Sequence, residues 1–80
     1  MKAYRVSFHC LKPGGGSVLF RVHTTDSLAK ARRMARNLVG FNVELEPGLT
    51  VPVAFTRVFR VSPRGAFYLN TFPVRHEGTL

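Results

Sequence analysis

Three histidines, His9, His23 and His76, are the side chains with the most obvious capacity for acid–base chemistry. A nuclease of the ribonuclease type needs two imidazoles within a few Å of one phosphate. A hairpin centred on Gly14 places His9 opposite Leu19, so His23 lies four strand residues further along, about 13 Å away. That separation is too large for one scissile bond. We therefore predict no catalytic residue and a protein that is not an enzyme, and we keep a small basic nuclease or toxin as the alternative.

The other groups that commonly bind metals or phosphates are poorly placed. Glu44 and Glu46 lie beside a Pro-Gly turn with no histidine near them in the sequence, which is typical of a solvated rim. Cys10 is the only cysteine, so it cannot form a disulfide within the chain, and we expect a small core residue. The glycines at 14–16 are not followed by Lys-Ser or Lys-Thr, which favours a hairpin tip over a phosphate-binding loop. We expect no metal site and no cofactor.

Positive charge is the strongest functional signal in the composition. The 80 residues include twelve Lys and Arg but only four Asp and Glu, which gives a formal net charge of +8. Nine of the twelve cations are Arg. A large net positive charge attracts polyanions. Arginine can also bind a phosphate or carboxylate group through two hydrogen bonds at once. The predicted partner is nucleic acid or an acidic surface of a protein or nucleoprotein complex.

The densest group of cations falls on the exposed face of a predicted helix. This face contains no acidic residue beyond the first turn, although ordinary solvated faces mix charges to gain i, i+4 pairs. Arg32 and Arg36 are one turn apart and repel each other. A solvated face with cations near the negative end of the helix dipole is the alternative interpretation. We predict that the main binding surface is formed by Lys30, Arg32, Arg33 and Arg36.

Two further groups of cations are candidate parts of the interface. One interleaves Arg57, Arg60 and Arg64 with aromatic residues, a combination that holds single-stranded nucleic acid in many proteins; these rings are Phe59, Phe67 and Tyr68. The alternative is that some of these rings belong to the core. The other group is the outer face of the first hairpin, which would gain charge below about pH 6.5 as its imidazoles protonate; its members are Arg5, His9, Arg21 and His23, with Ser7.

The first 23 residues predict a hairpin. Residues 2–11 and 17–23 both alternate apolar and polar side chains with the period of two that is typical of half-buried strands. A tip at Gly14 pairs Phe8 with Phe20 and Val6 with Val22 on the inner face. The same register places Arg21 and His23 on the outer face.

A helix is predicted over residues 27–39, with apolar side chains on one arc and Gly40 as its terminator. That arc should cover the apolar face of the hairpin. Residues 41–46 predict either a short edge strand or an ordered loop. Residues 51–61 and 66–72 predict a second hairpin whose two faces are both apolar. This pattern indicates either a β-bulge that switches the phase or a face that meets another chain. The second case would make the protein a structural homodimer with no nucleic-acid role, which we keep as a further alternative.

Together these elements predict one α+β domain over residues 1–80, with two layers: an antiparallel sheet of about four strands in the order ββαββ, and one helix on one face. No apolar run approaches the about 18 residues of a membrane span, and the N-terminus lacks the apolar region of a signal peptide. We expect a cytoplasmic protein that does not interact with membranes.

In element order, the chain resembles small phage proteins of the type I anti-CRISPR kind, which have one helix on a small antiparallel sheet. The opening residues 1–4, the helix at 27–35 and the strands after it carry this resemblance. It implies a stoichiometric inhibitor of a CRISPR–Cas surveillance complex in the host cytoplasm. The helical cations Lys30, Arg32, Arg33 and Arg36 would then contact an acidic surface or the nucleic acid itself. Mimicry of DNA is not expected, since a mimic must be acidic.

Overall fold

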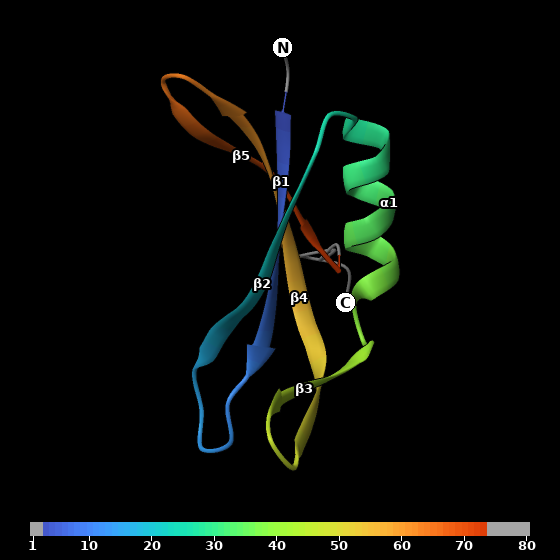
Figure 1. Cartoon of the computed structure of the whole chain (residues 1–80), viewed down its shortest axis with the longest axis vertical. Coiled ribbons are helices and arrows are strands. Elements are labelled where there is room, and N and C mark those ends of the chain that lie inside the picture. The colour runs from blue at the N-terminus through green and yellow to red at the C-terminus, as the bar shows by residue number, and fades with distance from the viewer. Residues whose placement is uncertain (1–2, 74–80) are drawn as a thin grey trace, which may run out of the picture.

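The structure is a computed structural model that describes residues 3–73, and it contains one helix and five antiparallel strands (Figure 1). The elements are β1 (Ala3–Leu11), β2 (Ser17–Thr25), α1 (Leu28–Leu38), β3 (Asn42–Glu46), β4 (Leu49–Ser62) and β5 (Gly65–Phe72). The predicted α+β class is confirmed. The fifth strand is β3, the segment for which the sequence left strand and loop open.

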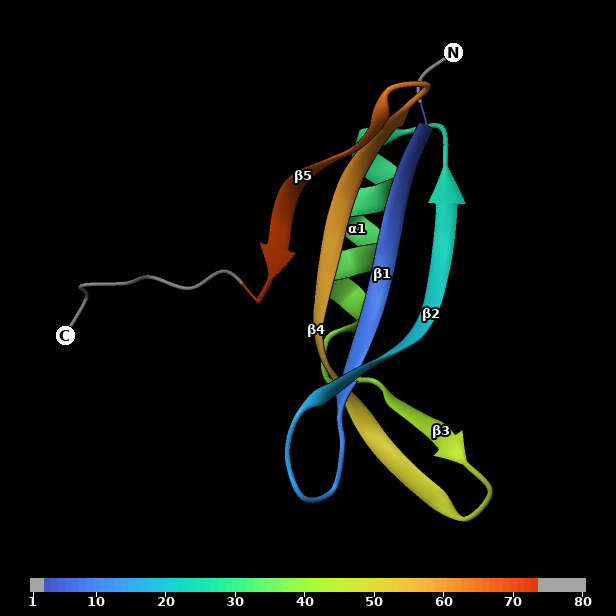
Figure 2. The same cartoon turned by 90° about the vertical axis from the view of Figure 1, so that its left-hand side faces the viewer.

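Strands β1 and β4 form the centre of the curled sheet. β1 pairs with β2 on one side and with β4 on the other. β4 is 14 residues long, which lets its first residues pair with β3 and its later residues pair with β5. Figure 2 shows α1 behind β1 and β4, with the opposite side of these strands turned to the viewer. We call the two sides of the sheet the helix side and the open face.

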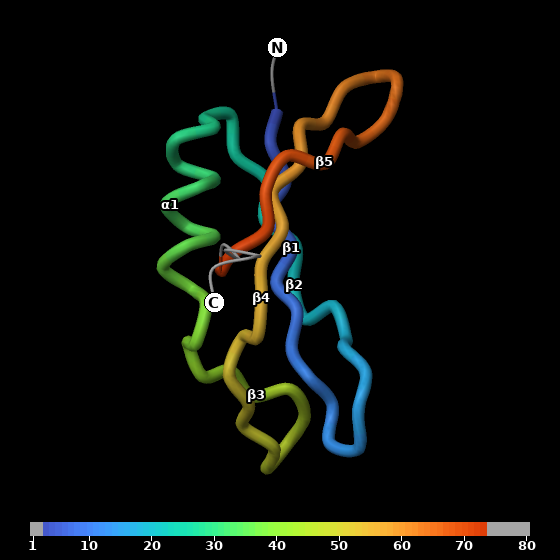
Figure 3. Tube along the Cα trace, turned by 180° about the vertical axis from the view of Figure 1, so that it is seen from behind, coloured from blue at the N-terminus to red at the C-terminus, as the bar shows by residue number. Residues whose placement is uncertain are grey.

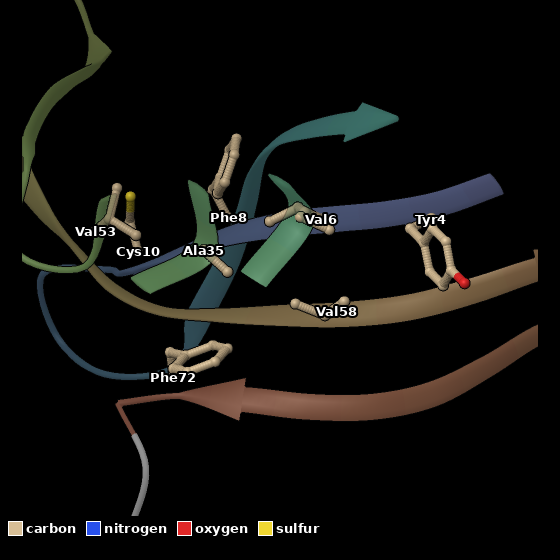
Figure 4. Close-up of a cluster of buried hydrophobic side chains, with 9 residues drawn as sticks. Tyr4, Val6, Phe8, Cys10, Ala35, Val53, Val58 and Phe72 are labelled. Carbon is tan, nitrogen blue, oxygen red and sulfur yellow. The ribbon is translucent and has the colours of Figure 1, made fainter. Parts of the chain in front are cut away.

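The core lies between α1 and the helix side of the sheet (Figure 4). Alternate residues of β1 supply four of its nine buried hydrophobic residues, namely Tyr4, Val6, Phe8 and Cys10, as their spacing predicted. The helix contributes the fully buried Ala31 and Ala35. Two alanines one turn apart let the helix approach the sheet closely, and larger side chains on either side of them complete the predicted apolar arc.

Local sequence signals determine where the helix begins and ends. The Ser27 hydroxyl accepts a 3.3 Å hydrogen bond from the amide of Lys30, as an N-cap does. After Leu38 the chain leaves the helix through Gly40, whose φ of +85° favours glycine over other residues. The predicted helix boundaries are correct to within one residue.

The register of the first hairpin is only partly as predicted. His9 pairs with Leu19, but a bulge at Phe20 shifts every later pair by one residue, so that Phe8 faces Arg21 and Val6 faces His23. A shift of one residue turns a side chain to the other side of the sheet. Arg21 and His23 therefore lie on the helix side, and the prediction that they share a face with Arg5 and His9 is wrong.

Bulges also explain the two apolar faces of the second hairpin. Val53 pairs with Cys10 whereas Phe55 pairs with His9, which leaves Ala54 as an extra residue in β4. The phase of the strand switches there, with Val53 in the core and Phe55 on the open face. Leu69 is the corresponding extra residue in β5. The bulge interpretation is confirmed, and a contact with another chain stays a prediction.

Candidate nucleic-acid interface

Two of the helical arginines lie on the flank of α1 that faces β5. Figure 3 shows the end of β5 running beside the helix. The Arg32 side chain donates a 2.9 Å hydrogen bond from Nε to Oδ1 of Asn70, and the Arg36 guanidinium lies 5.6 Å from the centre of the Phe72 ring. Both partners belong to β5. These two exposed cations of the helix are therefore positioned by contacts with the sheet.

A third arginine extends this flank along β4. Arg60 pairs with the core residue Tyr4, which places its side chain on the helix side, and its guanidinium lies 5.5 Å from the centre of the Phe67 ring. We call Arg32, Arg36 and Arg60 the α1–β5 stripe. The contact partner of each is an uncharged group on β5, either an amide oxygen or an aromatic face. Such contacts orient a guanidinium without neutralising its charge.

The other two helical cations lie on the opposite flank of α1, beside β2. There a hollow of about 500 Å³ is lined by Lys30 and Arg33 from the helix and by His23 from the strand, together with Thr25, Met34 and Asn37. His23 reaches this hollow only because of the bulge at Phe20. The four predicted helical cations thus lie in two pairs, with Arg32 and Arg36 beside β5 and Lys30 and Arg33 beside β2.

The remaining predicted cations are spread over the molecule. Arg57 lies on the open face, since it pairs with Ser7 and not with a core residue. Arg64 lies in the turn between β4 and β5, where its amide donates to the Ser62 hydroxyl. The cluster of Arg57, Arg60 and Arg64 predicted from the sequence is therefore not a single surface. Arg21 lies on the helix side over the ring of Phe20, at 5.5 Å.

On the open face, His9 is held between neighbours from two strands. Its ring stacks on Phe55 with centroids 4.6 Å apart, and its Nε2 lies 2.9 Å from the Ser7 hydroxyl oxygen. Burial and, to a lesser degree, the nearby Arg57 guanidinium lower the pKa of His9 from its ordinary value. Protonation of this residue therefore requires a lower pH than the value of about 6.5 expected from the sequence.

The described chain has few acidic side chains. Within residues 3–73 they are Asp26, Glu44 and Glu46, all exposed. The two glutamates belong to β3, which pairs with the beginning of β4, whereas Arg60 lies near the end of that strand. The topology thus separates Glu44 and Glu46 from Arg60, whereas Asp26 follows Thr25, which pairs with Tyr4, the strand partner of Arg60.

The structure gives the chemical candidates no common site. His9 and His23 lie on opposite sides of the sheet, so they cannot act together on one phosphate, and His76 lies outside the described residues. In the part of the chain that the structure describes, no group of three or more potential ligands could hold a metal ion. Cys10 is fully buried, and burial raises the pKa of its thiol.

Sequence reasoning missed the partners of the stripe. Asn70 and Phe72 received no role, because their contacts with Arg32 and Arg36 depend on β5 lying beside the helix. The bulge at Leu69, which brings Asn70 to the helix side, has no evident sequence signal. Alternation alone would place Asn70 on the same side as Tyr68, on the open face.

Comparisons with protein-family models, curated proteins and solved structures find no match to this chain. The resemblance to anti-CRISPR proteins accordingly stays a prediction. Among residues 3–73, no helix has the length and apolar character needed to cross a membrane.

Proposed function

We propose that this protein binds the phosphate backbone of nucleic acid along the α1–β5 stripe. The observation that carries the proposal is the state of the three guanidiniums, which are held by uncharged partners: Arg32 by an amide, and Arg36 and Arg60 by aromatic rings. An arginine ordered in this way loses less side-chain entropy when it binds an anion. Its full charge remains available for that anion.

The distribution of charge supports a polyanion as the ligand. The net charge of +8 is carried by a chain of only 80 residues. The second flank of α1, with Lys30 and Arg33, and the Arg21 side chain lie on the same side of the sheet as the stripe. A polyanion that follows the stripe therefore meets further positive charge on either side of the helix, whereas a single small anion would use only one part of it.

Two double variants with equal net charge test this proposal. One replaces Arg32 and Arg36 with Gln. The other replaces Lys12, in the β1–β2 turn, and Arg64, in the β4–β5 turn, with Gln. Affinity for a labelled mixed-sequence DNA, single-stranded and duplex, is measured by fluorescence anisotropy over a salt series. Each neutralised phosphate contributes about 0.9 to the log–log slope for duplex DNA and about 0.7 for a single strand.

We expect the slope of the Arg32→Gln, Arg36→Gln protein to fall by about 1.4 to 1.8. The Lys12→Gln, Arg64→Gln protein should keep the wild-type slope nearly unchanged, and circular dichroism checks that both variants are folded. Equal losses in the two variants would show that only net charge matters and would overturn the stripe as the site. Absence of DNA binding by the wild-type protein at low salt would overturn the proposed function itself.

A further inference from the structure

The open face gathers aromatic side chains from three strands. His9 of β1 stacks on Phe55 of β4, and Phe59 of β4 meets Tyr68 of β5 edge to face, with ring centroids 6.0 Å apart. In Figure 2 this side of β1 and β4 faces the viewer, with α1 behind the strands. Within residues 3–73 no helix lies over these rings.

Part of this aromatic surface is accessible. Tyr68 is 58% exposed, although its hydroxyl is hydrogen-bonded to that of Thr71. Next to Phe55 lies a hollow of about 410 Å³, which is lined by Leu11, Ala54, Phe55, Arg57, Thr71 and Pro73. The hollow and the exposed Tyr68 ring both lie along β4 and β5, where a planar ligand has access to them.

The charged groups of this face are arginines. Arg57 lies over the Phe55 ring at 5.1 Å, and Arg5 pairs with Phe59. The acidic residues of the described chain belong to β3 or precede the helix, so none lies among these rings. Aromatic rings that alternate with guanidiniums match a ligand that has planar bases and a negative backbone.

We propose that the open face binds unpaired nucleobases, so that the preferred nucleic acid is single-stranded. This inference rests on the proposed function and names its substrate class. In a duplex the faces of the bases are covered by their neighbours, whereas an unpaired base can stack on an exposed tyrosine. The phosphates that accompany such bases complement Arg5 and Arg57.

A second copy of the chain fits this face less well. Two copies joined face to face would bring Arg5 and Arg57 of each into one interface with no carboxylate from this surface to pair with them. Burial of unpaired charges is costly. Charge complementarity thus favours a negative ligand over self-association.

The geometry of β5 connects the open face to the α1–β5 stripe. Phe67 and Tyr68 are adjacent residues of this strand, and they contact Arg60 on the helix side and Phe59 on the open face, respectively. Only the thickness of one strand separates the two surfaces. A single strand of nucleic acid that passes over β5 therefore contacts the stripe with its phosphates and the open face with its bases.

Tyrosine fluorescence gives a direct readout of stacking. The chain has no tryptophan and only two tyrosines, of which Tyr4 is buried at 8% exposure and Tyr68 is exposed. The probes are a 12-nucleotide oligothymidylate and a 12-base-pair duplex. We expect tighter binding of the oligothymidylate, accompanied by quenching of tyrosine emission.

Three variants isolate the contribution of the open face. Tyr68→Ala should weaken oligothymidylate binding by about 5- to 150-fold and leave duplex affinity nearly unchanged. Tyr68→Phe keeps a ring for stacking, so it should retain the affinity while the quenching signal disappears. Phe41→Ala, which removes a 61%-exposed aromatic side chain between α1 and β3, is the matched control and should bind like the wild type.

The outcomes separate this inference from the proposed function. Equal affinity for the two probes, with no loss in Tyr68→Ala, would overturn the open face as a base-binding surface even if the stripe variants still lose their salt dependence. A wild-type dimer that dissociates in Tyr68→Ala without any change in DNA affinity would assign the face to self-association and overturn the inference. Failure to bind either probe would remove the proposed function and this inference together.

Discussion

The hydroxyl of Thr56, in the middle of β4, donates a 2.9 Å hydrogen bond to the carbonyl oxygen of Ala35 in the last turn of α1. Both residues are fully buried. The last four carbonyls of a helix need partners outside the regular i, i+4 pattern, and Thr56 supplies one of them. This contact joins the helix directly to the strand that pairs with β1, β3 and β5, so it fixes the position of the arginine flanks.

Loss of the Thr56 hydroxyl should therefore destabilise the fold. Thr56→Val keeps the volume of the side chain but leaves the buried Ala35 carbonyl without its partner, which should lower the free energy of unfolding by about 1–3 kcal/mol. Thr50→Val, at an exposed position of the same strand, should change stability by less than about 0.5 kcal/mol. Urea unfolding measures both, and equal effects would contradict a specific role for this hydrogen bond.

The buried thiol of Cys10 offers a second test of the core. Because burial raises its pKa and its relative exposure is 0%, little thiolate forms and reagents cannot reach it in the folded protein. At pH 8, labelling by iodoacetamide should be slower in buffer than in 8 M urea, by up to about 1,000-fold, since the core of a domain of this size supplies at most about 3–5 kcal/mol of stability. Mass spectrometry follows the reaction at this single cysteine. Similar rates in both solvents would place Cys10 at the surface.

The features that the sequence predicted correctly are those that depend on local signals. The alternation from Tyr4 to Cys10 identified the core face of β1, and Gly40 marked the end of the helix, because each of these signals is local. β3 could not be decided from sequence, since five alternating residues beside a Pro-Gly turn fit a strand and a loop equally well.

The arrangement of the candidate site depended on bulges, which the sequence does not mark. A single extra residue at Phe20 moved Arg21 and His23 to the helix side, and another at Leu69 brought Asn70 to Arg32. Side-chain types alone identified the cations of the candidate interface. Their grouping into a stripe depended on long-range packing of β5 against α1, which no local pattern contains.

Acidification should weaken the fold through His9. Its pKa is lowered by burial, and less strongly by Arg57, so the unfolded chain takes up this proton at a higher pH than the folded protein does. The stability that neutral His9 contributes is complete above the ordinary value of about 6.5, and it is lost as the pH falls below 6.5 through the depressed pKa of the folded state.

The measurement is the urea midpoint at pH 7.5 and at pH 5.5. We expect the wild-type midpoint to fall on acidification and the His9→Gln variant to lose less. His23→Gln is the matched control, because His23 is exposed and lies on the other side of the sheet. A His9→Gln protein with the full wild-type pH dependence would contradict the assignment to His9.

Salt should stabilise this protein, although it weakens most surface ion pairs. With a net charge of +8, and with the acidic residues of the described chain at positions 26, 44 and 46 only, repulsion among cations opposes the compact state. Raising NaCl from 0.01 to 0.15 M shortens the screening length from about 30 Å to about 8 Å. The urea midpoint should therefore rise over this range.

The variant Arg33→Gln tests whether part of that repulsion arises among the cations of the helix. It removes a charge one turn from Lys30 and beside His23, so it should raise the free energy of unfolding by about 0.2–0.5 kcal/mol in 0.01 M NaCl and by less in 0.15 M NaCl. Thr50→Val is again the neutral control. If the wild-type midpoint falls with salt instead, internal ion pairs must neutralise the cations, and the charge available to a nucleic acid is smaller than the stripe geometry implies.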